Sequence, residues 1–169
     1  MAERTLTEKE LNRALLARQL LLKRPKLSLP RAVERVGGLQ TQYAPSAYIG
    51  LWSRLAGFER DDLTRALERR MVVQGTLMRA TIHIVSARDY PLLAEGVRES
   101  RRESWVQYHR GRADARTVAG SARRARSFLA GEPRRRSELV EHLGADSATW
   151  NGVGLWLDLV RVPPSGTWE

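Results

Sequence analysis

The chain has 169 residues, of which 42% are hydrophobic, so it can bury a core and is not of the disordered type. Lysine and arginine number 29 against 19 acidic residues, which gives a net charge of +10, and the absence of cysteine excludes disulfides and thiolate chemistry. Nearly all of the positive charge is arginine, whose guanidinium group matches phosphate oxygens in pairs, so the composition favours a polyanionic partner; the alternative is a solvated face that reflects a GC-rich genome.

The first half of the chain predicts helices followed by a β-hairpin. Thr5 or Thr7 can cap a first helix, whose leucines recur near a 3.6-residue period and which ends by Pro25. Further helices are expected at 28–36, 44–55 and 60–69, and strands at 71–73 and 76–85. This order is typical of a winged helix-turn-helix module, in which the hairpin is the wing.

The second half repeats this order weakly. A connecting helix is expected from Asp89 to about Gln107, and a basic, glycine-bearing linker follows it. A helix from Ala115 to Ala130, a short helix that ends at Gly144 and an aromatic helix after Ser147 then recur in the order of the first half. Three tryptophans occupy apolar helical positions and are expected in the core rather than as base-stacking platforms: Trp52, Trp150 and Trp156.

We therefore predict a mainly α fold with small β-hairpins, built from tandem winged helix-turn-helix modules, of which the second is truncated. The expected divisions are a first module at 1–88, a connecting helix and linker at 89–112, and a second module with an incomplete wing at 113–169. The chain stops where the second wing is expected to begin, which leaves an apolar face uncovered. We expect the isolated chain to be marginally stable or to dimerise through that face.

The sequence gives no sign of a metal site, another cofactor or a membrane span. His83, His109 and His142 lie far apart without the spacing of metal ligands, so we expect no metal and no cofactor. No apolar run approaches the about 20 residues that a membrane span needs, and residues 1–4 begin no signal peptide. The expected location is the cytoplasm.

Gln40 and Gln42 lie one residue apart, directly after the pair Gly37 and Gly38 and before a helix that starts with proline. A glycine pair allows a sharp turn, and two carboxamides there present donors and acceptors without carrying charge. The glutamines are therefore candidates for contacts with a ligand in a chain whose charge suits nucleic acid. The alternative is that they only cap the turn and the next helix.

Basic residues elsewhere are candidates for contacts with DNA. Arg79 and His83 share strand parity, so both can face a groove, although His83 fits a hydrogen-bonded structural role equally well. Arg54 can reach a phosphate or pair with an acid. A basic run before a predicted helix can contact phosphates or form a solvated face, and it consists of Arg134, Arg135 and Arg136.

Four segments in order and spacing resemble the AlkZ/YcaQ-type winged-helix DNA glycosylases, a family of bacterial crosslink-repair proteins; the segments are 38–42, 50–54, 76–83 and 161–168. The resemblance implies tandem winged helices followed by a β-barrel, of which this chain holds the first module, the linker helix and most of the second module. The family signature is a glutamine, an aliphatic residue and a glutamine. Gln40 and Gln42 match it, and Thr41 departs from it by a hydroxyl.

The resemblance also implies a function, which is the excision of N7-alkylguanine and the unhooking of interstrand crosslinks in double-stranded DNA by hydrolysis of the N-glycosidic bond. Such a base is already cationic, so catalysis mainly requires a placed water and a stabilised oxocarbenium-like sugar. We expect Gln42 to polarise the water and Gln40 to act at the sugar or phosphate, with the reverse assignment left open. The chain alone is expected to need its missing C-terminal part, and its location would be the nucleoid.

Two other functions fit the same sequence. One is a non-enzymatic winged-helix DNA-binding protein, such as a transcriptional regulator, which would prefer one duplex sequence over others. The other is an inert fragment or a module that binds a partner.

Overall fold

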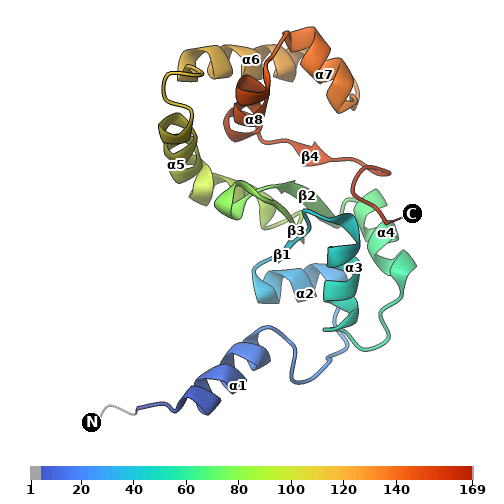
Figure 1. Cartoon of the computed structure of the whole chain (residues 1–169). Helices are drawn as coiled ribbons and strands as arrows, with labels where there is room; N and C mark the ends of the chain where they lie inside the picture. The colour runs from blue at the N-terminus through green and yellow to red at the C-terminus, as the bar shows by residue number, and fades with distance from the viewer. Residues whose placement is uncertain (1–4, 169) are drawn as a thin grey trace.

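The computed structural model describes residues 5–168. Glu169 and residues 1–4, on which the prediction about a signal peptide rests, lie outside the described residues. The predicted mainly helical fold with a small antiparallel sheet is confirmed (Figure 1). The elements in chain order are α1 Glu8–Arg18, α2 Leu29–Val36, β1 Leu39–Gln40, α3 Ala44–Trp52, α4 Arg60–Glu68, β2 Val72–Thr76, a short 3-10 helix Met78–Ala80, β3 Ile82–Ser86, α5 Tyr90–Tyr108, α6 Ala115–Phe128, α7 Arg136–Leu143, α8 Ser147–Trp156 and β4 Val160–Arg161.

The first module buries a core between α2, α3, α4 and the hairpin formed by β2 and β3. Its centre consists of large side chains that solvent barely reaches, among them Val33, Tyr48, Leu51, Leu63 and Ile84. Helix α2 ends where the predicted glycine turn begins, because Gly37 adopts the left-handed conformation. At Gly38 a Cβ atom would approach Val85 Cγ1 to 2.8 Å, so only glycine lets β1 pass this close to β3.

The sheet has the strand order β1-β3-β2-β4, with all pairs antiparallel. The predicted hairpin of β2 and β3 is present, and Gly75 pairs with His83 near its tip. On the other side of β3, Gln40 pairs with His83. The tip itself turns through two consecutive non-glycine residues with positive φ, Arg79 and Ala80.

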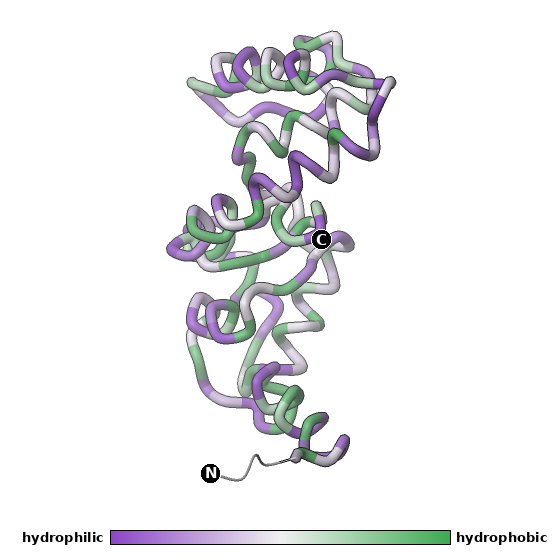
Figure 2. Tube along the Cα trace, turned by 90° about the vertical axis from the view of Figure 1, so that its left-hand side faces the viewer, coloured by the Kyte–Doolittle hydropathy of each residue, from purple (hydrophilic) through white to green (hydrophobic). Residues whose placement is uncertain are grey.

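The second module is formed by α6, α7 and α8, which lie at one end of the elongated molecule, with α1 at the other end and α2, α3 and α4 in between (Figures 1 and 2). Its core consists mainly of small and branched apolar side chains, including Ala122, Ala125, Leu139, Leu143 and Val153. Two aspartates accept hydrogen bonds from the first turns of their helices, Asp114 from the Thr117 amide and Asp146 from the Thr149 amide.

Helix α5 joins the two modules along its length. Arg98 forms an ion pair of 2.6 Å with Asp158, and Arg102 Nε donates to the Leu155 carbonyl at 3.0 Å. Near its start, the Tyr90 hydroxyl donates to the Leu159 carbonyl at 3.3 Å. Burial, followed by the nearby negative charge of Asp158, raises the pKa of Tyr90 to about 12, so this phenol stays a donor at neutral pH.

The segment predicted to open a second wing instead joins the sheet of the first module. Strand β4 pairs with β2, so that Val160 lies opposite Gly75 and Arg161 lies opposite Gln74. Gln74 is 1% exposed, and its Nε2 donates to the Gly166 carbonyl at 3.0 Å. The second module is therefore connected to the first both by α5 and by its own C-terminal segment.

One expectation about burial needs correction. Trp52 was predicted in the core, but its side chain is exposed on α3 and carries the Arg24 guanidinium at 5.3 Å from the ring centroid. Trp150 and Trp156 are partly buried against the second module, as predicted. Helix α1 buries none of its residues, although its leucines are spaced for one apolar face, because no other element covers that face (Figure 1). No helix within residues 5–168 combines the length and the apolarity needed to cross a membrane.

The contact between Gly166 and Gln74 predicts the effect of one methyl group. In Gly166→Ala the new Cβ would overlap the Gln74 carboxamide oxygen, and Gly166 has a φ of +88°, which alanine rarely adopts. We expect this variant to lower the free energy of unfolding by about 2 kcal/mol in urea titrations. The control is Gly131→Ala, because Gly131 has an ordinary φ and open space around it. Equal stability of both variants would show that the C-terminal segment is not held by this contact.

Candidate nucleic-acid interface

A groove of about 2190 Å³ lies between the two modules. Its walls come from the hairpin tip, from α5, from the loop between α6 and α7, from α8 and from the C-terminal segment. Among the described residues, six arginines and three acidic residues line it; the arginines are Arg79, Arg101, Arg134, Arg135, Arg136 and Arg161. This excess of arginine in a concave surface suits a polyanion.

Gln42 lines the groove, and its side chain extends the pairing of β1 with β3. The Thr41 amide donates to the Ile82 carbonyl at 2.8 Å, and the Ile82 amide donates in return to Gln42 Oε1 at 3.1 Å. Because only the oxygen of a carboxamide can accept from an N–H, this bond fixes which way the amide faces. No other bond to this side chain is found within residues 5–168, so the Nε2 group and the second lone pair of Oε1 can serve a ligand.

Gln40 and Thr41 lie differently from Gln42. The Gln40 side chain is exposed but is not part of the groove wall, and its carbonyl accepts from the Ser46 hydroxyl at 3.4 Å. Thr41 is fully buried, and its hydroxyl has no hydrogen-bond partner within residues 5–168. The middle position of the motif is therefore a core position, which explains why an aliphatic residue suits it.

The predicted basic run forms one wall of the groove. Arg134 makes an ion pair of 2.7 Å with Glu132, and its guanidinium lies 4.8 Å from the centroid of the Phe128 ring. The guanidinium of Arg136 lies 5.7 Å from the Trp150 ring. Aromatic rings thus support both side chains. Glu132 meets the charge of Arg134, whereas the planar group of Arg136 can meet a phosphate.

Two predicted contact residues lie away from the groove wall. Arg54 is half-buried and donates from Nη1 to the Gly50 carbonyl at 2.8 Å, and burial lowers its pKa. His83 is buried in β3, where its Nδ1 lies 3.0 Å from the Thr81 carbonyl, so the structural alternative describes it better. Arg79 and His83 do not share a strand as predicted, because Arg79 lies in the turn at the hairpin tip.

Sequence reasoning missed the contribution of α5. Its groove-facing residues recur at helical spacing and include Val97, Arg101, Trp105 and Tyr108. Arg101 is buried and donates to the Thr76 carbonyl, and burial, as the largest cause, lowers its pKa. The three- and four-residue spacing of these side chains was the signal in the sequence. Within the described part of the chain, no group of three or more histidine, aspartate or glutamate side chains is placed to hold a metal.

Comparison with known proteins identifies the relatives of this fold. Residues 33–169 match the model of the family described as DNA glycosylase AlkZ-like. Among solved structures, Streptomyces sahachiroi DNA glycosylase AlkZ is similar, with a TM-score of 0.71 and 23% sequence identity over 83% of this chain and 42% of that one. The chain thus spans less than half the length of this structural relative. No curated protein matches.

The buried Thr41 hydroxyl predicts a stabilising substitution. Thr41→Val replaces an unpaired hydroxyl with a methyl group of similar shape, so we expect the free energy of unfolding to rise by about 1 kcal/mol. Thr41→Ala should instead lower it, because it removes a packed methyl group and leaves a cavity. Chemical denaturation of both variants measures the difference. A destabilised Thr41→Val would mean that the hydroxyl has a partner.

Proposed function

The chain belongs to the DNA glycosylase AlkZ-like family, and we propose that it supplies the DNA-holding groove and the catalytic glutamine of a monofunctional DNA glycosylase. The observation that carries the proposal is the position of Gln42 on the wall of an arginine-rich groove, with its carboxamide oriented by the Ile82 amide. The arginines would bind the phosphates of double-stranded DNA and bring one nucleotide to Gln42.

The proposed substrate is N7-alkylguanine, including the alkylguanines of interstrand crosslinks. The bond between the sugar C1′ and the base N9 breaks, and its electron pair neutralises the cationic base as it leaves. Water adds to C1′ and releases a proton to solvent. Because the leaving base needs no protonation, the protein need only place the water and stabilise the developing sugar cation.

Gln42 has the groups that this reaction requires. One lone pair of Oε1 is taken by the Ile82 amide, so the second lone pair accepts a hydrogen bond from the water or faces the sugar cation. Nε2 can donate to an oxygen of the same nucleotide. We assign the water to Gln42 and a contact with the sugar or phosphate to Gln40, because Gln42 is the one of the two on the groove wall.

The proposed role of Gln42 has a direct test. In a protein that joins this chain to a C-terminal part like that of its longer relative, we expect release of N7-methylguanine from alkylated duplex. Gln42→Ala should reduce this release at least about a hundredfold, because it removes an oriented transition-state contact, while DNA affinity changes little. Release is followed by chromatography of the free base, and affinity by fluorescence anisotropy.

The matched control is Gln107→Ala, since Gln107 is an exposed glutamine of α5 outside the groove wall and should leave release unchanged. Unchanged release by Gln42→Ala would remove this residue from the mechanism. Binding that prefers one undamaged duplex sequence, with no base release, would support the alternative of a transcriptional regulator.

The arginines of the groove predict how DNA binding responds to salt. Arg79→Gln and Arg135→Gln should each weaken binding to any duplex sequence and reduce the slope of log K against log salt by about 1, because each removes one phosphate contact. Arg35→Gln is the control, since Arg35 is exposed on α2 and lies outside the groove. Affinities at several salt concentrations give the slopes. Equal slopes for all three variants would place the DNA elsewhere on the protein.

A further inference from the structure

One face of α5 lines the groove with charged and aromatic side chains that have no role in the proposed hydrolysis. Arg101, Trp105 and Tyr108 follow one another at intervals of four and three residues, so they lie along the same side of the helix. Ser100 and Ser104, each one residue before Arg101 and Trp105, also line the groove. The stripe runs from a buried guanidinium at one end to an exposed aromatic ring at the other.

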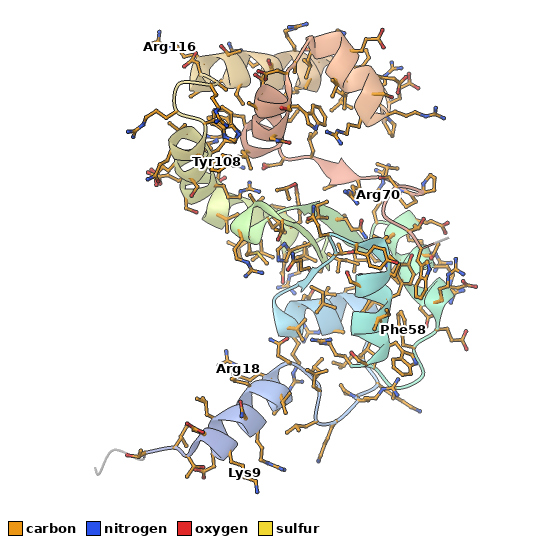
Figure 3. The ribbon with its side chains drawn as sticks, viewed as in Figure 1. Lys9, Arg18, Phe58, Arg70, Tyr108 and Arg116 are labelled. Atoms are coloured by element: carbon orange, nitrogen blue, oxygen red, sulfur yellow. The ribbon has the colours of Figure 1, made fainter. Side chains whose placement is uncertain are left out.

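Tyr108 is an exposed ring with a fixed support. It ends α5 and is 78% exposed, although it lines the groove (Figure 3). His109 packs against it edge to face, with ring centroids 4.9 Å apart, and stacks on the buried Trp105 at 4.7 Å. Trp105 in turn meets Trp156 at 5.5 Å. A ring that is backed in this way loses little freedom when a ligand stacks on it.

Trp105 anchors this support. Its side chain is 5% exposed, and it packs against Gly152 of α8, where a Cβ atom would approach Trp105 Cε2 to 2.9 Å. The buried indole therefore holds His109, and through it Tyr108, in place. A nucleotide brings an aromatic face for Tyr108 and phosphate oxygens for the arginines of the groove.

We propose that this stripe of α5 binds one unpaired nucleotide of the DNA in the groove, with its base stacked on the ring of Tyr108. The inference rests on the proposed function, because it requires DNA in the groove. The nucleotide is unpaired because a base inside a duplex has both faces covered by its neighbours and offers none to a side chain. Stacking contacts the face of the base and not its hydrogen-bonding edge, so any of the four bases can stack on Tyr108.

The test compares two DNA duplexes of equal length, one fully paired and one with a single-nucleotide bulge, by fluorescence anisotropy with the whole chain. Tyr108→Ala should weaken binding of the bulged duplex about tenfold, since stacking contributes about 1–3 kcal/mol per base. Binding of the paired duplex should change less than about twofold. Tyr108→Phe keeps the ring and should bind both duplexes as the unaltered chain does.

Tyr43→Ala is the matched control, because Tyr43 is 71% exposed but is not part of the groove wall. It should bind both duplexes unchanged. Thermal unfolding verifies that each variant is folded, and Tyr108→Leu, which lacks an aromatic face, replaces Tyr108→Ala if the alanine variant is not.

Two outcomes overturn the inference, and they are distinguishable. If the chain binds both duplexes and Tyr108→Ala weakens neither, or weakens both equally, the stacking site is wrong and the proposed function stands. If the unaltered chain binds neither duplex even at low salt, the groove does not hold DNA, and the proposed function fails together with the inference.

Discussion

The groove depends on the return of the C-terminal segment to the first module. Gln74 is a buried carboxamide at the centre of this contact, and its N–H group meets the Gly166 carbonyl while β4 pairs with β2 beside it. A buried amide is costly without a partner, so the segment and Gln74 stabilise each other. Together with the arginines of α5, this contact holds the second module above the hairpin tip, and the surface between them becomes concave.

Much of the fold could be predicted because its signals are local. Helix caps, the glycine turn at Gly37 and Gly38, and the β-branched hairpin are each written within a few residues. The position of β4 is different, since two exposed residues carry no strand pattern and their partner strand lies in the other module. The exposure of Trp52 and of the leucines of α1 could not be predicted either. Helical periodicity shows which face of a helix is apolar but not whether another element covers that face.

The candidate site was predictable only in part, because local signals identify its residues but not which of them meet in the fold. Gln42, Arg79 and the run at 134–136 do lie on one groove, but the sequence held no sign that the hairpin tip would face the loop between α6 and α7. Arg54 and His83 were assigned from residue type and parity, but their side chains bond to the backbone carbonyls of Gly50 and Thr81. The α5 face was not predicted, because its groove-lining residues mix apolar, charged and aromatic side chains and do not form a uniform apolar stripe. Tertiary geometry, which no short window contains, decides each of these cases.

The choice of glutamine follows from the charge of the groove. A carboxylate at position 42 would attract the surrounding arginines and compete with the phosphates that they would bind in the proposed complex. A carboxamide orients a water with the same geometry and carries no charge, so the arginines stay available for the DNA backbone. In the proposed reaction a base that is already cationic leaves without protonation, so an uncharged carboxamide would suffice at this position. A neutral base would instead need an acid placed beside it.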